Sequence, residues 1–303
     1  MARDQKGREE KRMSYLRHIE ACNPVITERF VPWVINGQVY GWLRPSFIEH
    51  LRQFDQLFAF SDSQVGLSNP AFQGKALTAE LTDVVNTLYE QGVLPHKPMN
   101  EPYPLTAGER DEAIAEIDRV AASHFGLRSF GQHLNGYVNY NGRLLLWVGK
   151  RARDRAIFPG AWDNMVAGGL PQGISLEENL IKECQEEAGM SAALAQQATY
   201  VGSIAYNRVN ANGFRPDVLY CYDIELPATF IPQNTDGEVE SFHLMPVEDV
   251  LKIVRDTDDF KLNCNLVIID FALRHRLISE DDPDYRALLT GLRQTPGVMN
   301  GMN

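Results

Sequence analysis

The N-terminal part of the chain opens with helical spacing of its apolar residues and then changes to strand-like runs. Met13, Leu16 and Ile19 recur at three-residue spacing in a charged arm, which predicts a short, partly frayed helix. The runs FVPWVI and QVYGWLR follow, and they flank Asn36-Gly37, a dipeptide typical of a tight hairpin. This part of the sequence therefore predicts one helix and a pair of antiparallel strands.

Further helices are predicted before the pattern changes again. Helical spacing of apolar positions covers residues 46–54 and 76–90. Thr106 followed by Glu109 has the spacing of a capping box, and it predicts another helix that ends near Gly126. Together with the hairpin, these helices indicate a small α/β domain.

The second half of the chain has the alternation expected of a sheet. The runs YVNY and RLLLWVG flank Asn141-Gly142 as a second hairpin, and ATYVGSIAYNRV, FRPDVLYCYDIEL and VESFHLM alternate like antiparallel strands. Helical spacing covers residues 247–255 and 266–277. Strands mixed with flanking helices predict a larger α/β domain.

Length and pattern together predict two domains and a tail. A chain of 303 residues has room for about two domains. We expect a small α/β N-terminal accessory domain at 1–126, the larger domain at 127–278, and a C-terminal tail at 279–303. The tail ends in TPGVMNGMN and is predicted to be disordered.

The segment SLEENLIKECQEEAG carries start and stop signals for one helix. Ser175 and Glu178 have capping-box spacing, and apolar residues recur every four positions behind them. Gly189 is a natural C-terminal stop. A glycine-rich stretch, AGGLPQG, precedes the segment. The local order is therefore glycine-rich loop, helix, loop.

Three acids on this helix point to a metal site. Glu183, Glu186 and Glu187 stand at i, i+3 and i+4, so their carboxylates converge on one side within about one turn. Such a patch repels itself unless a hard cation lies between the acids, and Mg²⁺ is commonly shared between protein carboxylates and substrate phosphates. The alternative is a solvated surface helix that is simply rich in glutamate.

Charge limits the class of partner. The chain is 44% hydrophobic and carries a net charge of -11, which argues against nucleic-acid binding because that requires a basic face. A small anionic substrate must then be bound by local groups. We expect a small anionic molecule as partner, with no nucleic acid and no membrane, and the sequence is compatible with a homodimer.

Cysteines and the N-terminus suggest a compartment. The four cysteines show no C-x-x-C or Cys/His metal spacing, so free thiols in a reducing compartment are expected. The first residues lack the apolar core of a secretory signal, and no run of about 18 apolar residues occurs. The expected localisation is cytoplasmic.

The loop, helix, loop order resembles the Nudix box of the Nudix hydrolases, G-x5-E-x7-R-E-U-x-E-E-x-G-U, where U is aliphatic. The positions in register are Gly168, Glu183, Cys184, Glu186, Glu187, Gly189 and Met190. Ile174 stands where the box has its first glutamate, and Lys182 stands where it has arginine. Lys182 keeps the positive charge but cannot fork across two carboxylates as arginine does.

Blocks beyond the box resemble the thiamin-pyrophosphokinase-related branch of Nudix hydrolases. GQHLNGYV, LWVGKRARDRAIFPGAWDNMVAGG, DGEVESFHLM and FKLNCNLVIIDFALRH carry the resemblance in the second domain, and WVINGQVYGWLRP carries it in the first. The resemblance implies a Nudix α/β/α sandwich with a mixed sheet behind an accessory domain. It also implies a diphosphatase that removes the terminal phosphate from thiamin diphosphate or its oxidised, damaged forms.

The resemblance implies roles for individual residues. Mg²⁺, or Mn²⁺ as a substitute, would be held by Glu183, Glu186, Glu187 and the main-chain carbonyl of Ala167. Nudix enzymes commonly bring a further acid from beyond the box, and Glu238 and Glu240 are the candidates for a ligand or general base. Glu238 is favoured, although both acids are also compatible with a solvated strand end.

The remaining site candidates lie before the helix. Arg151 and Arg155 are expected to bind the diphosphate, because a guanidinium can bond two phosphate oxygens at once. A solvated hairpin tip explains the same two arginines. Asn164, Gly168 and Gly169 are expected to contact substrate, with a role in loop structure as the alternative for Asn164.

Three other functions compete. Isopentenyl-diphosphate isomerase resembles this chain before the box, but it needs a cysteine where Ala167 stands and a metal-binding histidine where Gly169 stands. A hydrolase of another nucleoside-diphosphate-X, such as ADP-ribose, stays open because the box defines the chemistry and not the group attached to the diphosphate. A non-catalytic Nudix binding module is the third, and Ile174 is its support.

Overall fold

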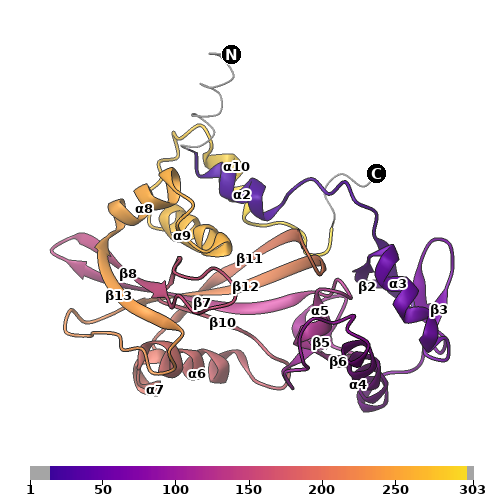
Figure 1. Ribbon diagram of the computed structural model, residues 1–303. Helices are drawn as coiled ribbons and strands as arrows, with labels where there is room; N and C mark the ends of the chain where they lie inside the picture. Colours follow the sequence, from indigo (N-terminus) through magenta and orange to yellow (C-terminus); the bar gives the residue numbers. More distant parts are fainter. Residues whose placement is uncertain (1–13, 299–303) are drawn as a thin grey trace.

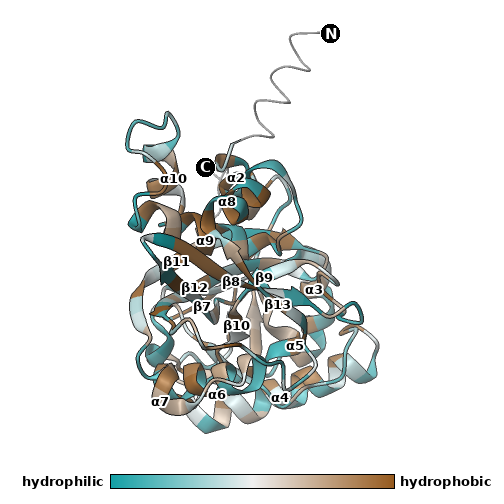
Figure 2. Ribbon diagram, turned by 90° about the vertical axis from the view of Figure 1, so that its left-hand side faces the viewer, coloured by the Kyte–Doolittle hydropathy of each residue, from teal (hydrophilic) through white to brown (hydrophobic). Residues whose placement is uncertain are grey.

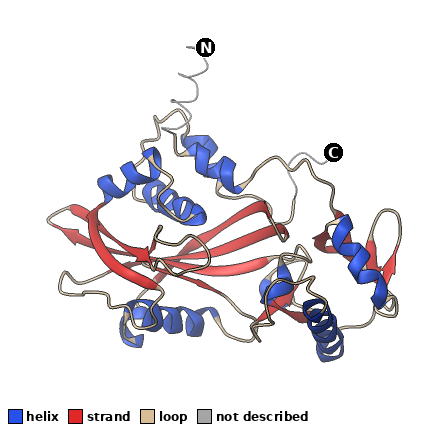
Figure 3. Ribbon diagram, viewed as in Figure 1, coloured by secondary structure: helices blue, strands red, loops and turns tan. Residues whose placement is uncertain are grey.

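The computed structural model describes residues 14–298 and shows a central sheet between two helical layers, with a smaller α/β unit at one end (Figures 1 and 3). Met13, which was expected on the first helix, lies outside the described residues. The predicted α/β class and the sandwich with its mixed sheet are confirmed.

The central sheet has seven strands in the order β11-β12-β7-β8-β13, with β10 paired to β7 and β9 paired to β8. Their bounds are β7 Ser129–Tyr140, β8 Arg143–Arg151, β9 Trp162–Asn164, β10 Val166–Gly169, β11 Thr199–Asn210, β12 Gly213–Glu225 and β13 Val239–Pro246. β12 runs parallel to β7 and the other pairs are antiparallel. The predicted hairpin turns at Asn141-Gly142, where both φ angles are positive, as a type I′ turn requires.

Two helical layers cover the sheet because its strands alternate. Leu146 and Val148 of β8 pack with one layer, while Trp147 between them packs with the other. The helices are α6 Leu176–Ala188 and α7 Ala192–Ala195 on one face, and α2 Leu16–Cys22, α8 Val247–Asp256, α9 Leu262–Arg274 and α10 Tyr285–Gly291 on the other. Figure 2 shows the hydrophobic helix α9 between the sheet and the outer helices α2 and α8.

The accessory unit has its own core around Trp33, Phe58 and Phe125. Its sheet order is β2-β1-β4-β3, and β5 and β6 form a separate pair. The bounds are β1 Val31–Ile35, β2 Gln38–Leu43, α3 Pro45–Leu51, η1 Arg52–Phe54, β3 Phe58–Phe60, β4 Val65–Leu67, α4 Gly74–Glu90, β5 Pro102–Leu105, η2 Arg110–Glu112, β6 Ala115–Asp118 and α5 Arg119–Ala122. The predicted first hairpin and the helices near 46–54 and 76–90 are confirmed.

The helix predicted from Thr106 to Gly126 is wrong. The capping box is formed by Glu109 and Glu112 and opens only the 3-10 turn η2, while the Thr106 hydroxyl bonds the Glu109 carbonyl. Burial then alternates along β6, which pairs with β5. Apolar residues in a short stretch can fit both the two-residue period of a strand and the 3.6-residue period of a helix, so the sequence pattern did not separate the two.

Both chain ends differ from the prediction. Helix α2, assigned by sequence to the accessory domain, contributes Ile19 and Cys22 to the core beneath α8 and α9. The segment expected as a disordered tail contains α10, whose Leu288 is fully buried in the same core. The prediction for residues 299–303 lies outside the described residues. Helices this short gain stability from packing that the local sequence does not reveal.

Gly126 lies where the segment after α5 packs against strand β2 of the first hairpin. The Trp42 N–H donates to the carbonyl of Phe125 at 3.1 Å, and Gly126 follows with φ +63°. A Cβ at Gly126 would lie 2.2 Å from the Trp42 carbonyl oxygen. Both the backbone conformation and the space therefore require glycine.

We expect Gly126→Ala to lower the free energy of unfolding by about 2–5 kcal/mol, the sum of a left-handed alanine and a backbone clash. Gly142→Ala is the matched control, since Gly142 has φ +80° but open space around it. That control should cost only about 1–2 kcal/mol in urea denaturation. Equal losses in the two variants would contradict the crowding argument.

Candidate functional site

The helix that carries the acids forms as its local sequence predicts. The Ser175 hydroxyl accepts the Glu178 N–H at 3.1 Å and the Glu178 carboxylate accepts the Ser175 N–H at 3.0 Å, so the capping box is complete. Gly189 ends α6 in the left-handed conformation with φ +61°. The helix thus begins directly after the glycine-rich loop and holds its acids against β10.

Glu187 is the most buried of the three acids. Its side chain is directed at β10, where its Oε2 accepts the N–H of Ala167 at 2.8 Å, and the residue is only 8% exposed. Burial raises the pKa of Glu187 to about 8, against the opposing effect of that hydrogen bond, and Asp163 and Glu183 raise it further. A cation beside a buried carboxylate stabilises its anionic form.

Glu183 lies directly against Gly168. A Cβ at Gly168 would fall 2.3 Å from the Glu183 carboxylate, so the glycine makes room for the acid. Burial raises the pKa of Glu183, partly offset by Lys182. The Lys182 ammonium lies 3.0 Å from a Glu183 oxygen and 2.9 Å from a Glu186 oxygen, and Glu186 is half-exposed. Lys182 thus partly neutralises the patch.

The direction of the Ala167 carbonyl, the expected main-chain metal ligand, follows from the pairing of β10. Ala167 pairs with His133 in the antiparallel ladder between β10 and β7, yet its N–H goes to Glu187. The N–H and C=O of one residue in such a ladder point to the same side. The carbonyl of Ala167 therefore also faces the acids, on the open edge of β10.

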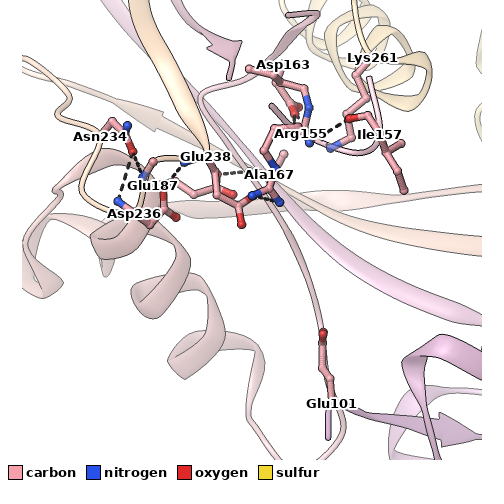
Figure 4. A network of polar contacts seen from close by, with 12 residues as sticks. Glu101, Arg155, Ile157, Asp163, Ala167, Glu187, Asn234, Asp236, Glu238 and Lys261 are labelled. Atoms are coloured by element: carbon pink, nitrogen blue, oxygen red, sulfur yellow. Dashed lines mark hydrogen bonds and ion pairs between the residues drawn. The ribbon is translucent and has the colours of Figure 1, made fainter. Parts of the chain in front are cut away.

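Glu238 faces the same cluster from the segment before β13. A turn built on Asn234 and Asp236 leads to it, and the Asp236 carboxylate accepts the Glu238 N–H at 2.8 Å (Figure 4). The Thr235 hydroxyl ties this turn to α6 through the carbonyl of Glu186 at 2.6 Å. The charge of Glu238 also contributes to the raised pKa of Glu183. Two segments distant in sequence thus meet at one acidic site.

The basic loop between β8 and β9 forms ion pairs with two acids at the beginning of β13. Arg155 lies 2.9 Å from Glu238, and Arg153 lies 3.4 Å from Glu240. Glu240 sits where β13 is irregular and its pair with the largely exposed Arg153 faces solvent. The geometry therefore favours Glu238 over Glu240 and leaves Arg155 close to the site.

Arg151 occupies a different position from the one expected. Its guanidinium bonds Asp163 at 2.8 Å, and Lys261 of the segment before α9 bonds the same oxygen at 3.1 Å. Only 13% of the Arg151 side chain is exposed. Although burial alone would raise the pKa of Asp163, Lys261 and its other partners lower it. The expectation that Arg151 binds diphosphate is thereby corrected to a structural role.

Asp163 also belongs to a buried group with His133 and Cys264, whose ligand atoms lie within 4.8 Å of one another. Such a trio could in principle hold a metal ion. Arg151 and Lys261 already neutralise Asp163, so a further cation there would be repelled. The trio instead fastens β9 to β7 and α9.

Asn164 is inside the fold. It is 3% exposed, its Oδ1 lies 2.8 Å from the His133 ring nitrogen, and its Nδ2 donates to Asn135 at 3.2 Å. Substrate contact is therefore corrected to the alternative, loop structure. The sequence could not separate substrate contact from a role in loop structure, because the burial of Asn164 depends on how α9 packs against β9.

Gly169 is surrounded by groups that the sequence analysis missed. A Cβ there would meet the Tyr103 hydroxyl at 3.1 Å, Arg119 at 3.4 Å and Glu101 at 3.5 Å, all from the accessory unit. Figure 4 shows Glu101 beyond the cluster of Ala167, Glu187 and Glu238. The accessory unit thus reaches the glycine-rich loop, which no local pattern in its sequence indicates.

Two family models match the chain. One, described as a domain of unknown function (DUF4743), matches residues 14–129, and the other, described as the NUDIX domain, matches residues 136–265. The predicted boundaries at 126 and 278 stay predictions.

Two plant relatives match nearly the whole chain, and a bacterial one matches about half of it. "Nudix hydrolase 20, chloroplastic" of Arabidopsis thaliana is 41% identical over 290 residues, covering 92% of this chain and 77% of that protein. "Nudix hydrolase 24, chloroplastic" of the same organism is 42% identical over 283 residues, with the same coverage of 92% and 77%. The isopentenyl-diphosphate Delta-isomerase of Salmonella arizonae is 25% identical over 159 residues, covering 52% of this chain and 85% of that protein.

The glutamate-bearing loop and helix, read with these matches, define the class: the chain belongs to the Nudix hydrolase family. It is accordingly an enzyme, a pyrophosphohydrolase that acts on diphosphate bonds. The family predicted from the box is thus confirmed by relatives that match 92% of the chain.

The predicted cytoplasmic localisation is contradicted. Both plant relatives that match 92% of the chain are named chloroplastic, which conflicts with that expectation. Among the residues that the structure describes, no helix combines the length and apolarity needed to span a bilayer.

We expect Gly168→Ala to lower kcat for diphosphate hydrolysis by roughly 10²-fold or more, because the new methyl group displaces the Glu183 carboxylate. The flexible Glu183 side chain can move aside, so the fold should survive. Gly142→Ala is the control, since Gly142 has open space around it and lies at the β7–β8 turn, outside this loop. Full activity in Gly168→Ala, measured beside that control, would contradict the assigned position of Glu183.

Proposed function

We propose that this enzyme is a Mg²⁺-dependent diphosphatase of thiamin diphosphate or of its oxidised analogues. The observation that carries the metal-dependent chemistry is that Glu183 and Glu187 lie against the backbone of β10, while the charges of Glu186 and Glu238 act on Glu183. The choice of a thiamin-type substrate is supported by the sequence blocks that resemble that Nudix branch in both domains.

The donor set fits a hard divalent cation. Carboxylate and carbonyl oxygens are the ligands that Mg²⁺ prefers, and Glu183, Glu186, Glu187 and the Ala167 carbonyl supply them. Burial raises the pKa of Glu187 to about 8, and the nearby charges of Asp163 and Glu183 add to this, so a cation beside the carboxylate would stabilise its charged form. When bound, Mg²⁺ supplies charge neutralisation for the diphosphate and a more acidic water, with Mn²⁺ as a substitute.

The chain's own residues then account for the hydrolytic step. A water oxygen forms a bond to the terminal phosphorus while the bond from that phosphorus to the bridging oxygen breaks. The bridging oxygen leaves with the thiamin monophosphate, the terminal group becomes inorganic phosphate, and Glu238 takes the proton of the water. In this proposal Arg155, which is paired with Glu238 at 2.9 Å, would turn to the phosphate and leave that carboxylate available.

The isomerase reaction is a weaker candidate. The Salmonella isomerase matches about half of this chain at 25% identity. The chain has Ala167 and Gly169 where that enzyme class requires a cysteine and a histidine, and Gly169 faces the accessory unit. The cysteine and the metal-binding histidine of that enzyme class are therefore both missing. A hydrolase of ADP-ribose or another nucleoside-diphosphate-X shares the same metal chemistry and differs only in the leaving group.

Substitution of the acids should separate catalysis from folding. We expect Glu186→Gln and Glu187→Gln to lower kcat by roughly 10²–10⁴-fold, because each removes a charge that holds the metal. In Glu187→Gln the side-chain amide oxygen can still accept the Ala167 N–H, so the fold should persist. Glu177→Gln, an exposed position on the first turn of α6, is the control. Retained turnover in both site variants, by phosphate release, would refute the metal assignment.

A substrate panel should identify the leaving group. Thiamin diphosphate, oxythiamin diphosphate, ADP-ribose, nucleoside triphosphates and isopentenyl diphosphate would each be tested with Mg²⁺ and with EDTA. We expect thiamin-type diphosphates to exceed ADP-ribose in kcat/KM, and all turnover to be lost in EDTA. A higher kcat/KM for ADP-ribose would contradict the thiamin proposal but would still agree with a Nudix hydrolase. Binding without turnover of any substrate would favour a non-catalytic module.

A further inference from the structure

The glycine-rich loop from Gly168 to Ser175 is held from outside its own domain. Its Gln172 N–H donates to the carbonyl of Pro102 in β5 at 2.7 Å. The Arg110 guanidinium donates to the carbonyl of Ile174 at 2.5 Å and also to that of Pro171. These bonds engage the main chain of the loop, so they set its path whatever its side chains are.

The first residues of the loop are also confined by the accessory unit. Tyr103, Arg119 and Glu101 surround the position where Gly169 would carry a side chain, and Arg119 bonds Glu101 at 2.9 Å. The accessory unit therefore touches the loop both at its start and at its end. Neither contact is to the acidic helix itself.

Arg110 is held in place before it reaches the loop. It begins the 3-10 turn η2, which the reciprocal capping box of Glu109 and Glu112 closes. The Thr106 hydroxyl fixes the preceding turn by bonding the Glu109 carbonyl at 2.8 Å. The guanidinium is half-buried, and its Nη2 nitrogen donates to both carbonyl oxygens.

Small movements of this loop must reach the acids. Glu183 fills the space beside Gly168, and Glu187 accepts the N–H of the residue before it. Ala167 and Gly168 are held in β10 by pairing with β7, and the loop leads from this strand into α6. A shift of the loop would therefore move α6 and its acids relative to these two contacts. Ile174 stands at the box position that carries a glutamate in the motif, and here the backbone of that residue is bonded by Arg110.

We propose that Arg110 is a positioning residue for the metal-binding carboxylates, and that the accessory domain serves the Nudix box by fixing the backbone of its loop. This inference rests on the proposed metal-dependent function. Arg110 does not touch the reacting atoms and acts through Ile174 and Pro171. The role of the accessory domain is thereby a mechanical one, exerted on the loop and passed to Glu183 and Glu187.

The decisive variants are Arg110→Ala and Arg110→Lys in the full chain. Removing a group that orients metal ligands typically costs 10–100-fold in metal affinity, so we expect Arg110→Ala to bind Mn²⁺ roughly 10–100-fold more weakly. The Mg²⁺ concentration for half-maximal turnover should rise by the same factor, with KM for the diphosphate little changed at saturating Mg²⁺. Arg110→Lys should recover part of the affinity, because one carbonyl stays within its reach.

Arg44→Ala is the matched control. Arg44 is also an accessory-domain arginine that donates to two main-chain carbonyls of the Nudix domain, those of Asn210 and Ala211, at the far hairpin. Its loss should destabilise the fold to a similar degree and leave Mn²⁺ affinity within about twofold. An equal loss of Mn²⁺ affinity in Arg44→Ala would overturn the specific role of Arg110.

Hydrogen exchange supplies a readout that needs neither metal nor turnover. In Arg110→Ala the amides of residues 168–175 should exchange at least about tenfold faster than in the native chain, and those of the 210–213 turn should not. Unchanged exchange and unchanged Mn²⁺ affinity would overturn the proposal. If Arg110→Ala does not fold, Arg110→Lys carries the same comparison. If amide exchange in residues 168–175 becomes faster in Arg110→Ala but the native chain hydrolyses no diphosphate, the proposed function is wrong. The role of Arg110 in holding the loop would then still stand.

Discussion

The site depends on one close contact, between the backbone of the β10–α6 junction and the carboxylates of α6. Gly168 has no side chain, so Glu183 can lie against the strand, and the N–H of Ala167 holds Glu187 beside it. Carboxylates this close repel one another, and burial strengthens the repulsion because the interior screens charge poorly. Lys182 offsets only part of it. The junction therefore favours a bound cation.

The buried ion pairs around Asp163 keep the strand edge in place. Arg151 and Lys261 come from β8 and from the start of α9, and they meet on one carboxylate of β9. A buried pair of this kind adds little net stability, but removal of one partner leaves an uncompensated charge and costs about 3–5 kcal/mol. The pairs thus determine that β8, β9 and the beginning of α9 lie together, and they contribute little to the free energy of unfolding.

The predictable parts of the fold were those in which one local signal was strong. Asn36-Gly37 and Asn141-Gly142 identified their hairpins because positive φ angles at both positions suit few residues. The stretch from Thr106 to Gly126 failed because its short strand and turns offer too few residues to separate a two-residue period from a helical one. Helix α10 was missed because its stability comes from packing on α2 and α9.

The sequence by itself determined the spacing of Glu183, Glu186 and Glu187 and the glycine before them, because a helix converts i, i+3 and i+4 into one face without help from the rest of the chain. Only the tertiary structure decided that Arg151 is bound to Asp163, that Asn164 is buried, and that Arg110 holds the loop. Those contacts join residues from different elements, in most cases from different layers or domains. Their formation depends on how strands and helices pack, and that is a property of the whole fold and not of any local pattern.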